Sequence, residues 1–330
     1  MRVRRRRLVA VGLGTALSVG VVGYAGAGLY VLETGTHLDG GCHQEHAAFT
    51  PAQWTDKVWV SGDFTPTLDV TPYQMADYRE VTFPSRGETN LTIHGWMIRA
   101  AKADAPVVIV VHGQGSCRRD PAVLLPAAML HRQDLGVLMI DMRDSGDSST
   151  EDGRFGAGSD EYRDVLGAWD WLVGQGVAPQ RIGVFGQSGG AAAIVVAMGE
   201  ESRVAAGWEE SGFMDMGTMV KEELKRMGFP DALALPATLW AQAFGDDFVG
   251  KSPLAEMAKM GTRPFQIVHG TADKRVNVHH ATDALAVLQR SSPSATAWLI
   301  PNGEHVEGPF LLPAEYEARL GAFFHAVLGA

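Results

Sequence analysis

The chain has 330 residues, 46% of them hydrophobic, which is enough for one large core and a small additional module. Its net charge of −10 is uneven, because residues 1–32 contain five arginines and no acid, which leaves 23 basic and 38 acidic residues elsewhere. An acidic main domain argues against nucleic acid as a partner. Composition gives no indication of the oligomeric state.

The N-terminus combines a basic flank with an apolar run. Five arginines precede an uncharged stretch from Leu8 to Leu32, which as a helix would be about 37 Å long. This length can cross a bilayer, with the arginines in the cytoplasm and Glu33 on the far side. Alternatives are a cleaved export signal, because Ala25-Gly26-Ala27 fits a processing site, and a buried core helix. We expect a membrane anchor over residues 1–32 and an extracytoplasmic catalytic domain; signal cleavage would instead give a secreted protein.

Residues 33–76 have no clear periodicity, and we expect an irregular extracytoplasmic stem. The segment contains several metal-ligand residue types but no metal-site spacing with a paired second half, so we expect a polar stem and no metal. These residues are His37, Asp39, Cys42, His43, Glu45 and His46. Cys42 and Cys117 are the only cysteines; in an oxidising compartment they could form a disulfide, or they could remain buried thiols.

From residue 77 to 330 strand and helix patterns alternate, which predicts an α/β domain with a mostly parallel eight-stranded sheet and helices on both faces. The expected strands are 78–84, 91–99, 107–112, 137–141, 182–186, 204–209, 265–269 and 296–300, and the expected helices are 122–133, 160–174, 191–198, 279–289 and 314–328. Residues 212–260 are one long insertion, with an amphipathic run followed by an apolar patch. We expect it to form a small helical cap over the site.

Gly186-Gln187-Ser188-Gly189-Gly190 joins an apolar strand pattern to an alanine-rich helix pattern. A serine at such a sharp turn has its hydroxyl exposed above the sheet, and the small glycines allow strand and helix to approach each other. The G-x-S-x-G spacing therefore predicts Ser188 as a nucleophile.

Two later loops contain the partners that an activated serine needs. Asp273 follows the strand pattern 265–269, and His305 follows the strand pattern 296–300. A serine hydroxyl is a weak nucleophile at neutral pH, so His305 would accept its proton while Asp273 orients the imidazole. The order along the chain is Ser188, Asp273, His305, as it is in one of the known triad arrangements.

These motifs resemble those of the α/β-hydrolase superfamily over roughly residues 79–328. The matching strings are GQSGG at 186–190, HGQGS at 112–116, HGTADKRV at 269–276 and GEH at 303–305. The turn from Asp141 to Ser148 is also similar to the family's, although Asp-Ser replaces the common pair inside it. The resemblance implies that the backbone N–H groups of Gln114 and Gly189 bind the oxyanion. Small membrane-anchored bacterial serine hydrolases, related to the catalytic domains of prolyl-oligopeptidase-type enzymes, are the most similar subfamily.

We therefore expect an exported serine hydrolase without cofactor or metal, most simply a carboxylesterase acting on short or medium acyl esters through an acyl-enzyme. A serine peptidase for short peptides is one alternative, with Glu209 or Glu210 as a candidate site for a substrate amine. A catalytically silent hydrolase-fold partner protein is another.

Overall fold

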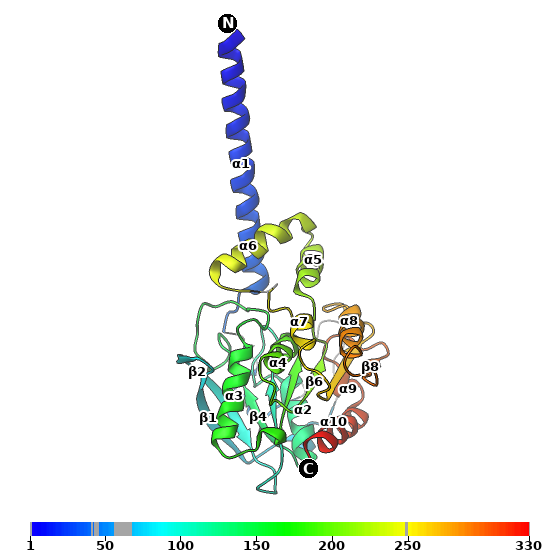
Figure 1. Cartoon of the computed structure of the whole chain (residues 1–330). Helices are drawn as coiled ribbons and strands as arrows, with labels where there is room; N and C mark the ends of the chain where they lie inside the picture. The colour runs from blue at the N-terminus through cyan, green and yellow to red at the C-terminus, as the bar shows by residue number, and fades with distance from the viewer. Residues whose placement is uncertain (1, 41, 43–45, 56–67, 248–249, 330) are drawn as a thin grey trace.

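The computed structural model describes residues 2–40, 42, 46–55, 68–247 and 250–329. A long N-terminal helix, α1 (Arg2–Thr36), projects from a rounded body that contains the sheet (Figure 1). The strands are β1 (Tyr78–Ser85), β2 (Glu88–Ile98), β3 (Val107–Val111), β4 (Gly136–Ile140), β5 (Ile182–Gln187), β6 (Ala206–Glu210), β7 (Phe265–Gly270) and β8 (Ala297–Ile300). The other α-helices are α2 (Pro121–Arg132), α3 (Tyr162–Gly174), α4 (Gly189–Glu200), α5 (Met216–Arg226), α6 (Ala234–Phe244), α7 (Pro253–Met257), α8 (His279–Leu288), α9 (Gly308–Leu311) and α10 (Pro313–Leu328).

The described strands form one sheet in the order β1-β2-β4-β3-β5-β6-β7-β8. The pairs β1/β2 and β2/β4 are antiparallel, and every other pair is parallel. The parallel strands therefore end at the same edge, where Val111 of β3 is paired with Gly186 of β5 and Gly270 of β7 with Ile300 of β8. The expected α/β-hydrolase fold is confirmed. The largest boundary error is at β2, which starts at Glu88 because a turn with positive φ at Gly87 lets pairing begin at once.

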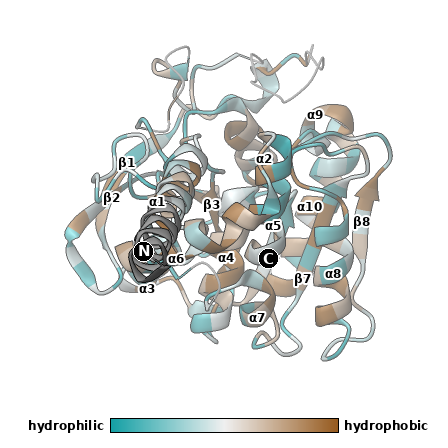
Figure 2. Cartoon of the chain, turned by 90° about the horizontal axis from the view of Figure 1, so that it is seen from above, coloured by the Kyte–Doolittle hydropathy of each residue, from teal (hydrophilic) through white to brown (hydrophobic). Residues whose placement is uncertain are grey.

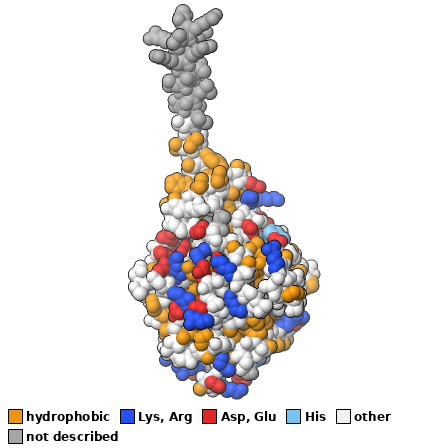
Figure 3. Space-filling view, in the orientation of Figure 1, with side chains coloured by type: hydrophobic (Ala, Val, Ile, Leu, Met, Phe, Trp, Pro, Cys, Tyr) orange, Lys and Arg blue, Asp and Glu red, His pale blue; other side chains and the backbone are white. Residues whose placement is uncertain are grey.

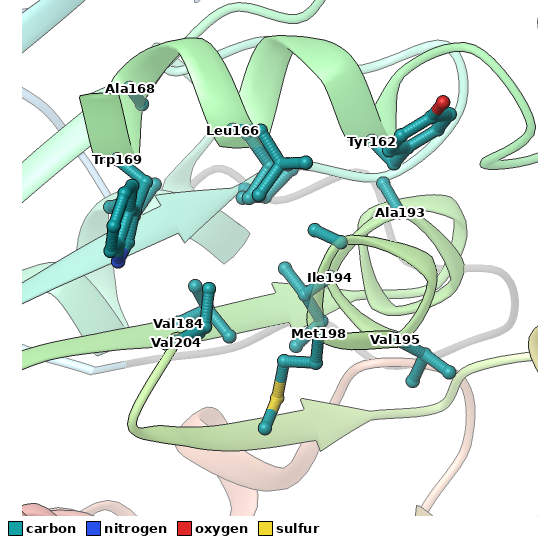
Figure 4. Packing of buried hydrophobic residues seen from close by; sticks show 14 of the residues in the cluster. Tyr162, Leu166, Ala168, Trp169, Val184, Ala193, Ile194, Val195, Met198 and Val204 are labelled. Atoms are coloured by element: carbon teal, nitrogen blue, oxygen red, sulfur yellow. The ribbon is translucent and has the colours of Figure 1, made fainter. Parts of the chain in front are cut away.

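Two apolar cores lie on opposite faces of the sheet, because side chains alternate along each strand. On β3, Ile109 faces one core and Val110 faces the other. The first core contains side chains of α3, α4 and α8, and Figure 4 shows Leu166 and Trp169 of α3 close to Val184 of β5. The second core packs under α2 and α10. In the view from above, α2 and α10 have brown, apolar segments (Figure 2). These two cores hold in place the strands whose ends support the site.

The insertion forms the expected helical cap, and α1 packs against it. Helix α6 crosses α1 where α1 leaves the body (Figure 1). The two helices approach closely at Gly28, where an added Cβ would lie 2.4 Å from Cβ of Pro236. Apolar atoms surround the base of α1 in the space-filling view (Figure 3). Within the described part of the chain, no helix has both the length and the apolar character that membrane crossing requires.

The described residues between 33 and 76, where we expected a stem, pack against the catalytic domain. Trp54 is buried in the second core, and the N–H of Leu38 donates to the carbonyl oxygen of Gly153 at 2.8 Å. Cys42 and Cys117 are joined in a disulfide, which is the first of the two alternatives that the sequence leaves open. Of the residues in this segment whose side chains could bind a metal, His43 and Glu45 lie outside the described residues.

Candidate active site

Ser188 lies at the turn between β5 and α4. Its backbone has φ 51° and ψ −118°, a conformation that few residues other than glycine adopt. An added Cβ on Gly186 would lie 2.4 Å from the carbonyl oxygen of Gly190, and one on Gly190 would lie 2.3 Å from that of His112. The G-x-S-x-G spacing is thus a steric requirement of this turn, because any larger residue would clash with backbone.

His305 and Asp273 form a hydrogen-bonded chain with Ser188. The hydroxyl of Ser188 donates to Nε2 of His305 at 2.9 Å, and Nδ1 of His305 donates to Asp273 at 2.8 Å. The other oxygen of Asp273 accepts the backbone N–H groups of Arg275 and Val276, each at 2.8 Å. The structure therefore brings together three side chains from loops that follow β5, β7 and β8.

A second histidine, His269, also contacts the carboxylate of Asp273. It is fully buried; its Nε2 donates to the carbonyl oxygen of Val276 at 2.9 Å and lies 3.4 Å from Asp273. Burial by itself raises the pKa of Asp273, but the contacts with His269 and His305 outweigh burial and hold that pKa well below its usual range. The acid is thus kept ionised, as orienting an imidazole requires. The sequence analysis did not identify His269 as part of the site, although it lies in the same HGTADKRV string as Asp273.

The two expected oxyanion residues are adjacent to each other and to the serine. An added Cβ on Gly189 would lie 2.9 Å from the backbone nitrogen of Gln114, and one on Gly113 would lie 3.5 Å from Oγ of Ser188. Gly189 is the first residue of α4, so no carbonyl within the helix can accept its N–H. Both amides are therefore close to the space where a carbonyl oxygen bound at Ser188 would lie.

Buried hydrogen bonds fix the loop that carries Gln114. Nε2 of His112 accepts the N–H of Met142 at 2.9 Å, so its Nδ1 carries the proton and donates to the carbonyl oxygen of Gly113 at 2.8 Å. The carboxylate of Asp141 accepts the N–H of Arg118 at 2.8 Å. The unusual Asp-Ser pair in the following turn leaves this contact in place.

Ser188, His305 and Gln114 line an open cleft of about 380 Å³, which we call the serine cleft. Arg275, two residues after Asp273, lines it too and forms an ion pair with Glu223 of cap helix α5. The sequence analysis missed Arg275. Its place in the HGTADKRV string was the available signal, but its partner on the cap is 52 positions earlier in the sequence.

The structure does not present Glu209 or Glu210 to a substrate amine, because both lie in the core beneath the cleft. Glu210 accepts hydrogen bonds from Gln187, Tyr316 and the N–H of Gly308, each at 2.9 Å. Burial raises the pKa of Glu209 to about 8 and that of Glu210 to about 7. Both side chains are structural.

One described cluster, Glu222, His279 and His280, has residue types that bind metals. Nε2 of His279 lies 2.8 Å and Nε2 of His280 lies 3.2 Å from the carboxylate of Glu222. However, Nδ1 of His280 accepts the N–H of Met214 at 3.2 Å, so the proton of a neutral ring is on Nε2, the atom that would have to bind the metal. The cluster fits a hydrogen-bonded contact between α5 and α8 better than a metal site.

A family model described as the prolyl oligopeptidase family matches residues 123–330, well over half of the chain. The chain belongs to the prolyl oligopeptidase family. It is therefore a hydrolase of the α/β-hydrolase superfamily, as the sequence motifs led us to expect.

The chain is also similar to a curated protein and to solved structures. This chain is 23% identical to "Uncharacterized protein YfhR" of Escherichia coli strain K12, and the match covers 69% of this chain and 73% of that one. It is similar to the structure of the Pyrococcus furiosus esterase Pf2001, with a TM-score of 0.63, 22% identity, and coverage of 82% of this chain and 98% of that chain. A puromycin-hydrolyzing peptidase of Mycobacterium tuberculosis has a TM-score of 0.59 at 17% identity, with 78% and 40% covered. At these identities the two structures show a shared fold.

Proposed function

We propose that this protein cleaves carboxylic esters through an acyl-enzyme, with Ser188 as nucleophile, His305 as general base and acid, and Asp273 as the residue that orients His305. The hydrogen-bonded chain Ser188–His305–Asp273 is the observation that carries this proposal. A complete chain argues against the silent partner protein.

The chemistry follows from that chain. Oγ of Ser188 attacks the ester carbonyl carbon while its proton moves to Nε2 of His305. The oxyanion accepts hydrogen bonds from the N–H groups of Gln114 and Gly189, each worth roughly 3 kcal/mol of the barrier. His305 then returns the proton to the leaving alcohol as its C–O bond breaks. Water, deprotonated by His305, attacks the acyl-enzyme and releases the acid and free Ser188.

An ester fits the cleft better than a peptide does. The cationic group of a free peptide N-terminus needs a partner, since burying it unpaired costs several kcal/mol. Glu209 and Glu210 are buried in the core, and Glu223 is paired with Arg275. Of the two carboxylates that line the cleft, Asp120 caps helix α2, and Asp39 is exposed to water, where an ion pair with an amine contributes little. The names of the esterase and peptidase neighbours are compatible with either substrate class.

A substrate panel tests this preference. We expect kcat/KM for p-nitrophenyl acyl esters to exceed that for aminoacyl and dipeptidyl p-nitroanilides by at least about 100-fold, or about 3 kcal/mol. A p-nitrophenyl ester is intrinsically more reactive than a p-nitroanilide, so aminoacyl p-nitrophenyl esters are the control that separates leaving-group reactivity from recognition of the substrate amine. Faster turnover of the dipeptide anilides would replace the esterase proposal by the peptidase alternative.

We also propose that the catalytic domain lies outside the cytoplasm. The five arginines before the apolar run support this orientation. The disulfide Cys42–Cys117 supports it too, because disulfides persist in oxidising compartments. Helix α1 continues through Ala25-Gly26-Ala27, and the carbonyl oxygen of Ala25 accepts a hydrogen bond from Trp240 of the cap at 2.8 Å. This contact favours retention of the N-terminal segment over its cleavage.

Protease accessibility checks the topology. Protease added to intact spheroplasts is expected to digest the catalytic domain while a cytoplasmic marker protein stays whole. Digestion only after lysis would place the domain in the cytoplasm. Release of the active domain into the medium, with a new N-terminus near residue 28, would support cleavage instead of anchoring.

A further inference from the structure

A second, apolar cavity of about 70 Å³ lies between α1, the cap and the body. We call it the apolar chamber. Its walls include Val31 and Leu32 of α1, Met216 and Met219 of α5, and Phe155 of the body, all of them buried. Unbranched methionine side chains adapt to ligands of differing shape. The lining ions Arg275 and Glu223 are paired with each other, so the chamber has no unpaired charge among its described lining residues.

The chamber meets the serine cleft beside the expected oxyanion residue Gln114. Gln114 and Arg275 line both cavities. An added Cβ on Gly189 would lie 2.6 Å from the ring of Phe155 and 2.9 Å from the nitrogen of Gln114. A carbonyl oxygen held by these two amides is therefore next to the chamber wall, and the carbon chain attached to that carbonyl has an apolar space beside it.

Helix α1 is fixed where it forms the chamber wall. The side chain of Gln114 donates from Nε2 to the carbonyl oxygen of Gly35 at 2.8 Å, and the N–H of Phe155 donates to the carbonyl oxygen of Thr36 at 2.8 Å. On its other side α1 touches α6 at Gly28 and Pro236. The end of α1 is thus part of the active-site region, and both contacts tie it to residues that border the serine.

We propose that the apolar chamber holds the acyl chain of the substrate, so that the N-terminal helix is a wall of the acyl site and the preferred substrates are esters of neutral, unbranched medium-chain acids. This proposal rests on the proposed esterase function. Each methylene that leaves water on binding contributes roughly a fourfold gain in affinity. If a bulky side chain fills the chamber, long acyl chains lose that gain in affinity. An acetyl group does not reach the chamber, so the hydrolysis of acetate esters is little affected.

The test compares p-nitrophenyl octanoate with p-nitrophenyl acetate in the full-length protein. In Leu32→Trp, which fills the chamber from α1, the octanoate-to-acetate ratio of kcat/KM is expected to fall by at least about 30-fold. Met219→Trp fills it from α5 and is expected to do the same, which keeps the test available if one variant folds poorly. Val22→Trp is the matched control on α1, because Val22 is 72% exposed, and its ratio is expected to stay within about twofold of wild type.

The outcomes separate the two proposals. If wild type hydrolyses esters and both chamber variants keep the wild-type ratio, the acyl chain binds elsewhere and this inference is overturned. A uniform loss on both esters in both variants would also overturn it, since it would indicate that α1 only positions the oxyanion loop. If the folded wild type hydrolyses no ester at all, it is the proposed function that fails.

Discussion

Ser188→Ala is expected to lower kcat for ester hydrolysis by at least about 10⁴-fold and to abolish covalent labelling by a fluorophosphonate probe. Without Oγ no acyl-enzyme can form, and only binding and the oxyanion amides remain to assist attack by water. Among the described residues the hydroxyl makes one hydrogen bond, to His305, so the fold should survive its removal. Kinetics with the best ester of the panel, together with intact-protein mass spectrometry after labelling, measure both effects.

Ser291→Ala is the matched control, because Ser291 is an exposed serine on the body. It should label and turn over as wild type does. The labelling result excludes contamination by wild-type protein. If Ser188→Ala then turns over esters within about tenfold of the wild-type rate, the acyl-enzyme mechanism is contradicted.

Asp273→Asn is expected to lower kcat by about 10³–10⁴-fold with little change in KM. The amide oxygen of asparagine would remain with the N–H groups of Arg275 and Val276, which puts its NH₂ group toward Nδ1 of His305. His305 must then accept at Nδ1 and hold its proton on Nε2, so it can no longer accept the proton of Ser188. Kinetics of the variant measure the loss, and thermal unfolding measures the stability.

Asp283→Asn is the control for this substitution, since Asp283 is an exposed carboxylate that also contacts a histidine, at 3.1 Å. Its kcat should stay close to that of wild type. A folded Asp273→Asn protein with nearly full activity would mean that His305 is oriented by another group, and His269 would then be the first residue to examine, because it contacts the same carboxylate.

The parts of the site that sequence could predict are those encoded by short-range patterns. Ser188 is recognisable because the turn between β5 and α4 admits no side chain at Gly186 or Gly190. Asp273 and His305 are recognisable because each follows an apolar strand within a few residues, and parallel strands end at one edge of the sheet. The assignment of the catalytic roles to these residues remains the proposal that the two substitutions above test.

The sequence by itself determined the alternation of strands and helices, the eight-stranded sheet and the position of the cap, because periodicity and turn residues act over a few neighbours. The tertiary structure decided what depends on distant contacts. It joined Cys42 to Cys117, paired Arg275 with Glu223, and brought the end of α1 against Gln114. No local pattern encodes such contacts, since each depends on how helices pack around the sheet after its strands have been placed. The apolar chamber arises only from that packing.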